Sequence, residues 1–304
     1  MKDKVIIRLS NNLGNQMFMY ASAFAFAKKL NRELFIDNET AFKNSVKIHN
    51  YNLDIFNFNS KIAPKYLKFL GISGYIRRKY LKYIDKFSKI KRFYIEEKHD
   101  NKSTVYEKKI FDGYFKEKLF VEGHFESENY FANYSNEIKN EFSFKEENIY
   151  KKNPYYSDIK NSNSVCLCVR QNRFSEKKRE ISQKDINESL IFTKDQINYI
   201  IKAIDLIKSK VTNPKFFLWS NDYEGLDSYF SKNEYSRISS NNIGLDLFLM
   251  SNAKHFIVVP SAYNWWGAWL SNNNNKIIIR PSDNNFRNFS INNSDFWPSK
   301  WLKI

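Results

Sequence analysis

Arg170 ends an otherwise apolar stretch, VCLCVR (165–170), and carries a group that can bind phosphate. A guanidinium presents paired N–H groups that match two phosphate oxygens. A second arginine, Arg173, follows three residues later. The alternative is an arginine that only extends into solvent. We favour phosphate binding, because ligands of parallel α/β sheets bind at the carboxyl ends of the strands.

Three other expected strand ends carry polar side chains. The stretch 5–9 leads into SNNLGNQ, where a glycine permits a tight turn and the following helix offers free N–H groups to an anion. The stretch 216–220 ends in Ser-Asn-Asp, which could bind ribose hydroxyls or supply a carboxylate, and the stretch 255–260 leads into Ser-Ala-Tyr-Asn. The donor-binding candidates are therefore Gly14, Asn15, Gln16, Arg170, Ser220, Asn221, Asp222, Ser261 and Asn264.

Each of these candidates has an ordinary structural alternative. A glycine before a helix is common in βα turns, and Ser or Asp often caps a helix. Beyond Ser261 the sequence WWGAW (265–269) holds three tryptophans, of which at least one is expected in the core, while others could line a pocket. As a set, however, Arg, Ser, Asn and Asp at neighbouring strand ends suit a diphosphate and a ribose.

Strands and helices alternate at both ends of the chain. Residues 5–9, 15–30 and 33–37 predict a βαβ opening, and from residue 165 onward apolar strands alternate with helices such as 194–210 and 261–271. Residues 40–160 give no clear boundaries. The pattern predicts an α/β protein with doubly wound parallel sheets. We expect an N-terminal domain at 1–160 and a C-terminal domain at 161–304.

The composition fits a folded, basic protein. Of 304 residues 42% are hydrophobic, and the net charge is +16. Residues 61–110 hold fifteen Lys or Arg and five Asp or Glu, with many aromatics between them. Such a surface could contact an anionic membrane or nucleic acid, or be only a solvated face. We see no apolar run long enough for a signal peptide or a membrane span, and the two cysteines do not suit a disulfide. We therefore expect a cytoplasmic protein.

Metal chemistry is not expected. The four histidines, His49, His99, His124 and His255, lack ligand spacing, and no two Asp are separated by a single residue. A nucleotide-sugar enzyme of the metal-dependent Asp-Xaa-Asp type is therefore disfavoured. Walker, nucleophile-elbow and Gly-Xaa-Gly-Xaa-Xaa-Gly motifs do not occur in the sequence.

Three long stretches make the chain resemble glycosyltransferase family 11, the α-1,2-fucosyltransferases. LSNNLGNQMFMYA is similar to the family's Gly-Leu-Gly-Asn-Gln-Met-Phe-Xaa-Tyr-Ala start. VEGHFESENYF resembles its Gly-Tyr-Xaa-Gln-Ser-Glu-Lys-Tyr-Phe region, and LMSNAKHFIVVPSAYNWWGAWL resembles its Leu-Met-Ser and Asn-Ser-Ser-Phe-Ser-Trp-Trp-Gly-Ala-Trp-Leu block. The family's central His-Xaa-Arg-Arg-Gly-Asp-Tyr corresponds to Cys168–Phe174, where only Arg170 matches.

The resemblance implies two Rossmann-like domains of the GT-B type and an inverting transfer without a metal ion or other cofactor. GDP would bind the C-terminal domain and the acceptor the N-terminal one. The donor would be GDP-fucose, and the acceptor the 2-OH of a galactoside in a glycan such as a bacterial surface polysaccharide. The family arginine that binds the pyrophosphate carries over to Arg170.

The expected catalytic residues are Arg170, Asp222 and Glu176. Arg170 would stabilise the leaving diphosphate, and either carboxylate could act as a base, between which the sequence does not choose. The expected partners are a nucleotide sugar and a glycan acceptor, with a peripheral contact of residues 61–110 to the inner membrane face as a further option and no nucleic acid. The alternatives are another nucleotide-sugar donor, a non-catalytic relative, or a basic binding protein for nucleic acid or membrane.

Overall fold

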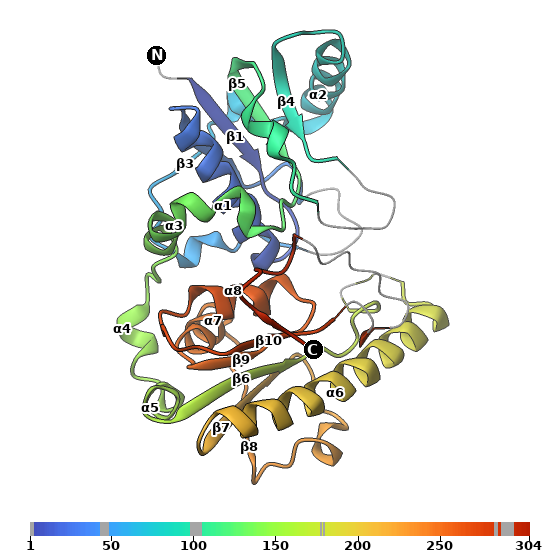
Figure 1. Cartoon of the computed structure of the whole chain (residues 1–304). Helices are drawn as coiled ribbons and strands as arrows, with labels where there is room; N and C mark the ends of the chain where they lie inside the picture. The colour runs from blue at the N-terminus through green and yellow to red at the C-terminus, as the bar shows by residue number, and fades with distance from the viewer. Residues whose placement is uncertain are drawn as a thin grey trace. The chain divides into compact units, whose positions relative to one another are not determined.

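The computed structural model describes residues 3–42, 49–97, 105–176, 178, 180–282, 285–286 and 295–304. The chain forms two compact units (Figure 1), one of Met1–Ser143 with Ser294–Phe296 and one of Phe144–Asn293 with Trp297–Ile304. Both are α/β units built on a parallel sheet. The doubly wound α/β architecture predicted from the sequence is confirmed.

The N-terminal unit contains a five-stranded parallel sheet in the order β3-β2-β1-β5-β4. Its strands are β1 (Lys4–Arg8), β2 (Glu33–Asp37), β3 (Lys61–Ile62), β4 (Lys91–Ile95) and β5 (Phe115–Glu122). Its α-helices are α1 (Leu13–Lys29), α2 (Gly71–Asp85) and α3 (Ser135–Glu141). Its 3-10 helices are η1 (Leu53–Ile55), η2 (Lys65–Leu67), η3 (Lys108–Phe111), η4 (Glu128–Tyr130) and η5 (Ala132–Tyr134).

Helix α1 lies in the core of this unit because it is apolar on nearly every side. Every residue from Gln16 to Ala27 is buried. Small alanines alternate with large rings, so the helix packs closely on the sheet while Phe26 contacts four other aromatic rings. The βαβ opening fixes the register of β1 against β2, with Lys4 opposite Glu33 and Arg8 opposite Asp37.

The C-terminal unit contains a six-stranded parallel sheet in the order β11-β10-β9-β6-β7-β8. Its strands are β6 (Asn163–Val169), β7 (Pro214–Ser220), β8 (Tyr235–Ile238), β9 (His255–Ile257), β10 (Ile278–Arg280) and β11 (Leu302–Lys303). Its helices are α4 (Glu147–Tyr150), α5 (Pro154–Asn161), α6 (Gln183–Lys210), η6 (Leu226–Ser228), α7 (Ile243–Ser251) and α8 (Ala262–Leu270). This strand order, starting in the centre and reversing once, is that of dinucleotide-binding Rossmann folds.

The chain enters this unit earlier than the 160/161 division expected from the sequence. Phe144, Tyr150 and Tyr156 all pack their rings against Phe248 of α7. Helices α4 and α5 therefore belong with the C-terminal unit, in which aromatic rings of this segment pack on α7. No apolar periodicity in this Lys- and Asn-rich stretch indicates that attachment.

Two details differ from the sequence expectations. Helix α6 begins at Gln183 rather than residue 194, because Ser182 and Asp185 form a capping box at its N-terminus. The rings of Trp265, Trp266 and Trp269 are all buried, with at most 8% exposed, and pack on one another. The tryptophan cluster is therefore core, and the option that some of these rings line a pocket is not supported.

Candidate functional site

Two of the expected binding residues flank the point where the C-terminal strand order reverses. β7 and β9 lie on opposite sides of β6. Ligands of such sheets bind in the crevice at this switch point, outside the carboxyl ends of the strands. Arg170 directly follows β6, and Ser261 is the N-cap of α8, which follows β9. The sheet thus places an arginine on one side of the switch point and a helix N-terminus on the other.

The guanidinium of Arg170 is held side-on by Glu176. Its Nε lies 3.1 Å from Oε2 of the carboxylate and its Nη2 lies 2.9 Å from Oε1. Both side chains are partly buried, with 21% and 17% exposed. Within the described part of the chain the remaining N–H groups of Arg170 form no hydrogen bond. Glu176 therefore fixes the plane of the guanidinium and leaves its outer edge able to bind an anion.

The backbone of Arg170 is held from helix α6 by Gln196. The fully buried Gln196 accepts a hydrogen bond from the amide N–H of Arg170 at 3.0 Å and donates one to its carbonyl oxygen at 3.1 Å. These two hydrogen bonds replace the backbone hydrogen bonds to neighbouring strands that the chain loses where β6 ends. The sequence analysis missed Gln196, although a glutamine beside Ile197 and Ile200 on an apolar helix face is a usable signal.

The loop after β6 is tied to the loop after β7. Gln171 donates its amide N–H to Oδ1 of Asn221 at 2.8 Å, and Nδ2 of Asn221 donates back to the carbonyl of Gln171 at 3.0 Å. The side chain of Gln171 also donates to the carbonyls of Asp222 and Glu224, both at 2.9 Å. Asn221 therefore positions the two strand ends relative to each other.

Ser220 and Asp222 form a local turn. The Ser220 hydroxyl donates to the carbonyl of Asp222 and accepts the amide N–H of Asp222 at 3.2 Å. Oδ1 of Asp222 accepts the amide N–H of Glu224 at 2.9 Å, while Oδ2 lies 3.5 Å from Nδ2 of Asn172. The serine hydroxyl is thus used in the turn, and the Asp222 carboxylate stays partly exposed.

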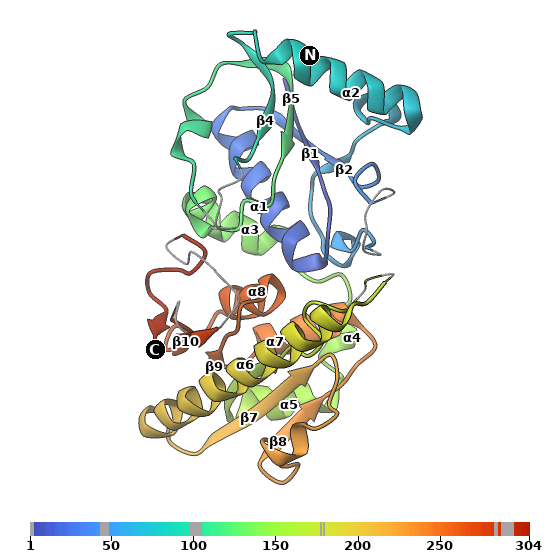
Figure 2. The same ribbon diagram turned by 90° about the vertical axis from the view of Figure 1, so that its right-hand side faces the viewer.

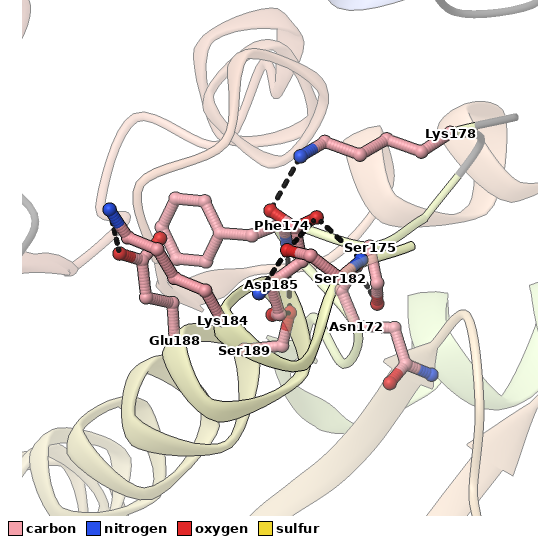
Figure 3. A network of polar contacts seen from close by, with 9 residues as sticks. All are labelled: Asn172, Phe174, Ser175, Lys178, Ser182, Lys184, Asp185, Glu188 and Ser189. Carbon is pink, nitrogen blue, oxygen red and sulfur yellow. Dashed lines mark hydrogen bonds and ion pairs between the residues drawn. The ribbon is translucent and has the colours of Figure 1, made fainter. Parts of the chain in front are cut away.

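The segment between Arg170 and α6 is anchored to the first turns of that helix (Figure 3). The Phe174 amide donates to Oγ of Ser189 at 3.0 Å, and Lys178 pairs with Oδ1 of Asp185 at 2.5 Å. Hydrogen bonds from Lys178 and Ser182 lower the pKa of Asp185 to about 2. This network holds the segment that carries Glu176 beside the end of β6.

Asn264 and Ser261 have different environments. Asn264 is buried, with 2% exposed; its Oδ1 accepts the Val259 amide at 2.8 Å and its Nδ2 lies 3.1 Å from Sγ of Cys168. This side chain therefore links the segment after β9 to β6 and has a positioning role in the structure. The Ser261 hydroxyl makes no capping hydrogen bond to α8 and is partly exposed.

In the N-terminal unit, the first strand, β1, pairs directly with the last strand, β5, so that their carboxyl ends lie side by side. Two side-chain pairs join the segments after these strands. Nδ2 of Asn11 lies 2.8 Å from Nε2 of His124, and Nδ2 of Asn15 donates to Oε1 of Glu126. Glu126 is partly buried and His124 is exposed. Side chains that can hydrogen-bond to a sugar hydroxyl thus lie at the carboxyl ends of β1 and β5, and they include an imidazole and a carboxylate.

The predicted residues Gly14 and Gln16 lie in the buried start of α1. Gln16 is fully buried, donates to the carbonyls of Asn11 and Asn50, each at 2.7 Å, and accepts the amide N–H of Asn52 at 2.9 Å. Its amide is therefore fully used in joining the β1–α1 turn to a neighbouring loop. Of the three residues predicted here, Asn15 has a partly exposed side chain.

Two half-buried carboxylates near strand ends have raised pKa values. Burial raises the pKa of Glu96, after β4, although the amide N–H groups of His124 and Phe125 oppose the rise. Burial also raises the pKa of Asp246, in the first turn of α7, to about 6, while the nearby Ser240 and Trp219 side chains lower it. Perturbed carboxylates in such places are candidates for function. The sequence analysis named neither.

Among the described residues, no group of three or more His, Cys, Asp or Glu side chains could hold a metal ion. Across the same residues, no helix is long and apolar enough to span a bilayer. His99 lies outside the described residues.

A model of glycosyl transferase family 11 matches residues 1–304, the whole chain. The chain belongs to glycosyl transferase family 11. It is 30% identical over 308 residues to an α-1,2-colitosyltransferase of Escherichia coli, covering 99% of this chain and 98% of the relative. It is 24% identical over 300 residues to the O-antigen biosynthesis glycosyltransferase WbnK of the same species, covering 90% and 92%.

The fold is also that of known fucosyltransferases. The structure of the NodZ α-1,6-fucosyltransferase soaked with GDP-fucose matches with a TM-score of 0.53 and 14% identity, over 89% of this chain and 93% of NodZ. The suspected family 11 membership and the GT-B-type fold are thereby confirmed. Membership makes the chain a fucosyltransferase-like glycosyltransferase rather than the non-catalytic basic protein considered as an alternative.

Within family 11, this chain retains one residue of the central His-Xaa-Arg-Arg-Gly-Asp-Tyr motif, Arg170. The side-chain clamps on Arg170, from Glu176 and Gln196, come from outside the part of the motif that is lost. His124 and Glu126 stand where the family's second stretch has Tyr and Gln. These two differences place an imidazole and a carboxylate at the carboxyl ends of β1 and β5.

Proposed function

We propose that this family 11 enzyme transfers fucose from GDP-fucose to a glycan hydroxyl, the 2-OH of a galactoside, with inversion and without a metal ion. The observation that carries the proposal is Arg170 at the C-terminal switch point, where Glu176 orients its guanidinium and Gln196 holds its backbone. GDP would bind this unit and the acceptor the N-terminal one. The reaction would take place in the cytoplasm, on a glycan such as a surface polysaccharide.

The leaving diphosphate carries the charge that the enzyme must stabilise. The outer N–H groups of Arg170 can bind two phosphate oxygens, because Glu176 uses only the side-on pair. The hydroxyl of Ser261 and the N-terminus of α8 offer further donors across the switch point. One well-placed donor of this kind lowers a barrier by about 3–4 kcal/mol. We therefore assign Arg170 to the leaving group and a positioning role to Glu176.

The acceptor hydroxyl loses a proton during the transfer. Both oxygens of Glu176 are paired with Arg170, so Glu176 is the weaker of the two bases predicted from the sequence. Asp222 keeps a partly exposed carboxylate in the C-terminal unit. We add His124, an exposed imidazole beside Asn11 at the carboxyl ends of β1 and β5, as the acceptor-side alternative. Replacing each group and measuring turnover separates the two.

A second donor, GDP-colitose, is favoured by one observation. The relative that shares 30% identity over nearly the whole chain is named as a colitosyltransferase. Colitose is fucose without its 3-hydroxyl. A site that hydrogen-bonds this hydroxyl rejects the deoxy sugar by about 10⁴-fold or more, whereas an apolar pocket that excludes it discriminates by only about 10²-fold. The ratio of kcat/KM for the two donors therefore identifies the kind of pocket.

The test is release of GDP or UDP from GDP-fucose, GDP-colitose, GDP-mannose and UDP-sugars, with and without a β-galactoside. Acceptor-dependent release from GDP-fucose alone supports the proposal, and product analysis by methylation gives the linkage. A higher kcat/KM for GDP-colitose than for GDP-fucose would identify colitose as the sugar that is transferred. A folded protein that binds no GDP and releases none from any donor refutes it.

A further inference from the structure

Helix α2 is attached to its unit through polar groups. Gly74 and Asp85 are its only buried residues. Arg78 and Lys82 both pair with Glu122 at the end of β5, and Asp85 accepts backbone N–H groups after the helix at 2.8 and 3.0 Å. The face that packs on the unit therefore carries charged and small residues together with the partly buried Leu81 and Ile84. Figure 1 and Figure 2 show α2 beside this sheet, next to the edge strand β4 in Figure 1.

The opposite side of this segment is apolar and exposed. Its residues recur at intervals of four, four, three and four positions and so share one side. They are Ile72, Ile76, Tyr80, Tyr83 and Phe87, with 82%, 60%, 62%, 61% and 77% of their surface exposed. We call this set the outer face of α2. A helix of a globular domain normally buries its apolar face and exposes its charges. Here five large apolar side chains are exposed instead.

Positive charge surrounds the outer face. Between Gly71 and Arg92 the sequence has eight Lys or Arg and a single acidic residue, Asp85, which is buried. Lys79, Lys86 and Lys89 are exposed on this segment. An exposed apolar stripe with cations beside it is complementary to a bilayer with anionic headgroups. Tyrosine rings also suit the boundary between headgroups and acyl chains.

We propose that the outer face of α2 docks on an anionic phospholipid bilayer, with the apolar side chains at the headgroup boundary and the lysines on lipid phosphates. A second copy of the chain would bring two strongly cationic faces together, which disfavours a dimer. Negative charge on the partner relieves that repulsion. The sequence indicated a membrane contact only for residues 61–110 as a whole, of which 98–104 lie outside the described residues. The structure assigns the contact to one face of one helix.

The test is co-sedimentation of the full chain with vesicles of phosphatidylcholine alone and of phosphatidylcholine with 30% phosphatidylglycerol. We expect binding to the anionic vesicles that falls with added salt. The variant Ile76→Ser/Tyr80→Ser/Phe87→Ser should lower the partition coefficient by about tenfold or more, since it removes three inserted side chains. Lys79→Gln/Lys86→Gln/Lys89→Gln should remove most of the preference for anionic lipid.

The matched control is Tyr114→Ser/Ile149→Ser/Leu190→Ser, which changes three equally exposed apolar residues elsewhere, at 81%, 62% and 64% exposure. This control should bind vesicles like wild type, and all three triple variants should keep the wild-type Tm and the turnover on a soluble acceptor. Equal binding by all variants, equal loss in the control, or no binding by wild type overturns the proposal. A dimer in light scattering that the outer-face variant abolishes would instead identify a second copy as the occupant.

Discussion

Replacement of Arg170 by alanine is expected to slow the transfer strongly while leaving the fold intact. The guanidinium has one pair of N–H groups on Glu176, at 3.1 and 2.9 Å, and its outer edge toward the proposed diphosphate. Loss of one such contact to a developing charge costs about 3–4 kcal/mol, or roughly 10²–10³ in kcat/KM. Arg170→Lys keeps the charge but not the planar fork, so we expect an intermediate loss.

Stability should respond less than activity. The pair is only partly buried, so removing one partner should cost about 1–3 kcal/mol of unfolding free energy. Glu176→Gln breaks the side-on pair but leaves the guanidinium in place, so turnover should fall by about tenfold through loss of orientation. In a double-mutant cycle, the losses from Arg170→Ala and Glu176→Gln should not add, because Glu176 acts through Arg170.

The assay is steady-state GDP release together with calorimetric binding of GDP, for each variant and for the control Lys178→Met. Lys178 belongs to the same segment, and its ammonium group pairs with Asp185 (Figure 3). The control should stay within about threefold of wild type. If Arg170→Ala keeps near-wild-type turnover and GDP affinity, the leaving-group role is wrong. If the control loses as much, the effect is one of loop anchoring.

Three further changes test the supporting structure. Gln196→Ala should destabilise the fold by about 2–4 kcal/mol and lower kcat, because the backbone N–H and C=O of Arg170 lose their buried partner. Denaturation measures the first effect and GDP release the second. Asp246→Asn should stabilise the protein by about 1–2 kcal/mol at pH 8. The pKa of Asp246 is raised to about 6 in the fold, so the unfolding free energy of the wild type falls as pH rises from about 4 through 6, and partial exposure to water reduces this loss. Equal stability gains at pH 4 and pH 8 would contradict this. Gly74→Ala should weaken the attachment of α2, since a Cβ there would lie 2.4 Å from the backbone carbonyl carbon of Phe69, and faster hydrogen exchange in α2 is the expected readout.

The fold could be predicted where elements follow one another closely in the sequence. Residues 5–37 gave the βαβ opening, and the alternation after residue 165 gave the second sheet, because hydrophobic periodicity reports local structure directly. The stretch 40–160 gave nothing comparable. Strand β5 pairs with β1 over a long sequence separation, while β4, which precedes β5, becomes the sheet edge. Such pairing depends on tertiary contacts that periodicity does not contain.

The candidate site was predictable in type but not in detail. Strand ends offered Arg170, Asp222 and Ser261, since only position in the sheet is needed to find them. The sequence did not reveal that Gln16 and Asn264 would be committed to internal hydrogen bonds, because a polar residue beside a strand end can point either way. His124 also escaped notice, since the strand before it lay in the stretch without clear boundaries.

The pattern of losses in the central motif bears on the mechanism. The positions corresponding to the family's His, second Arg, Gly and Asp are changed, yet Arg170 keeps a side-on carboxylate and a fully buried amide clamp. One clamp orients the guanidinium and the other holds the backbone that carries it, an arrangement suited to a guanidinium that must meet two phosphate oxygens. Because a guanidinium stays charged, the leaving-group half of the reaction needs no proton transfer. The step that moves a proton is then the acceptor half, where His124 is the exposed imidazole that we propose as one of the two candidate bases.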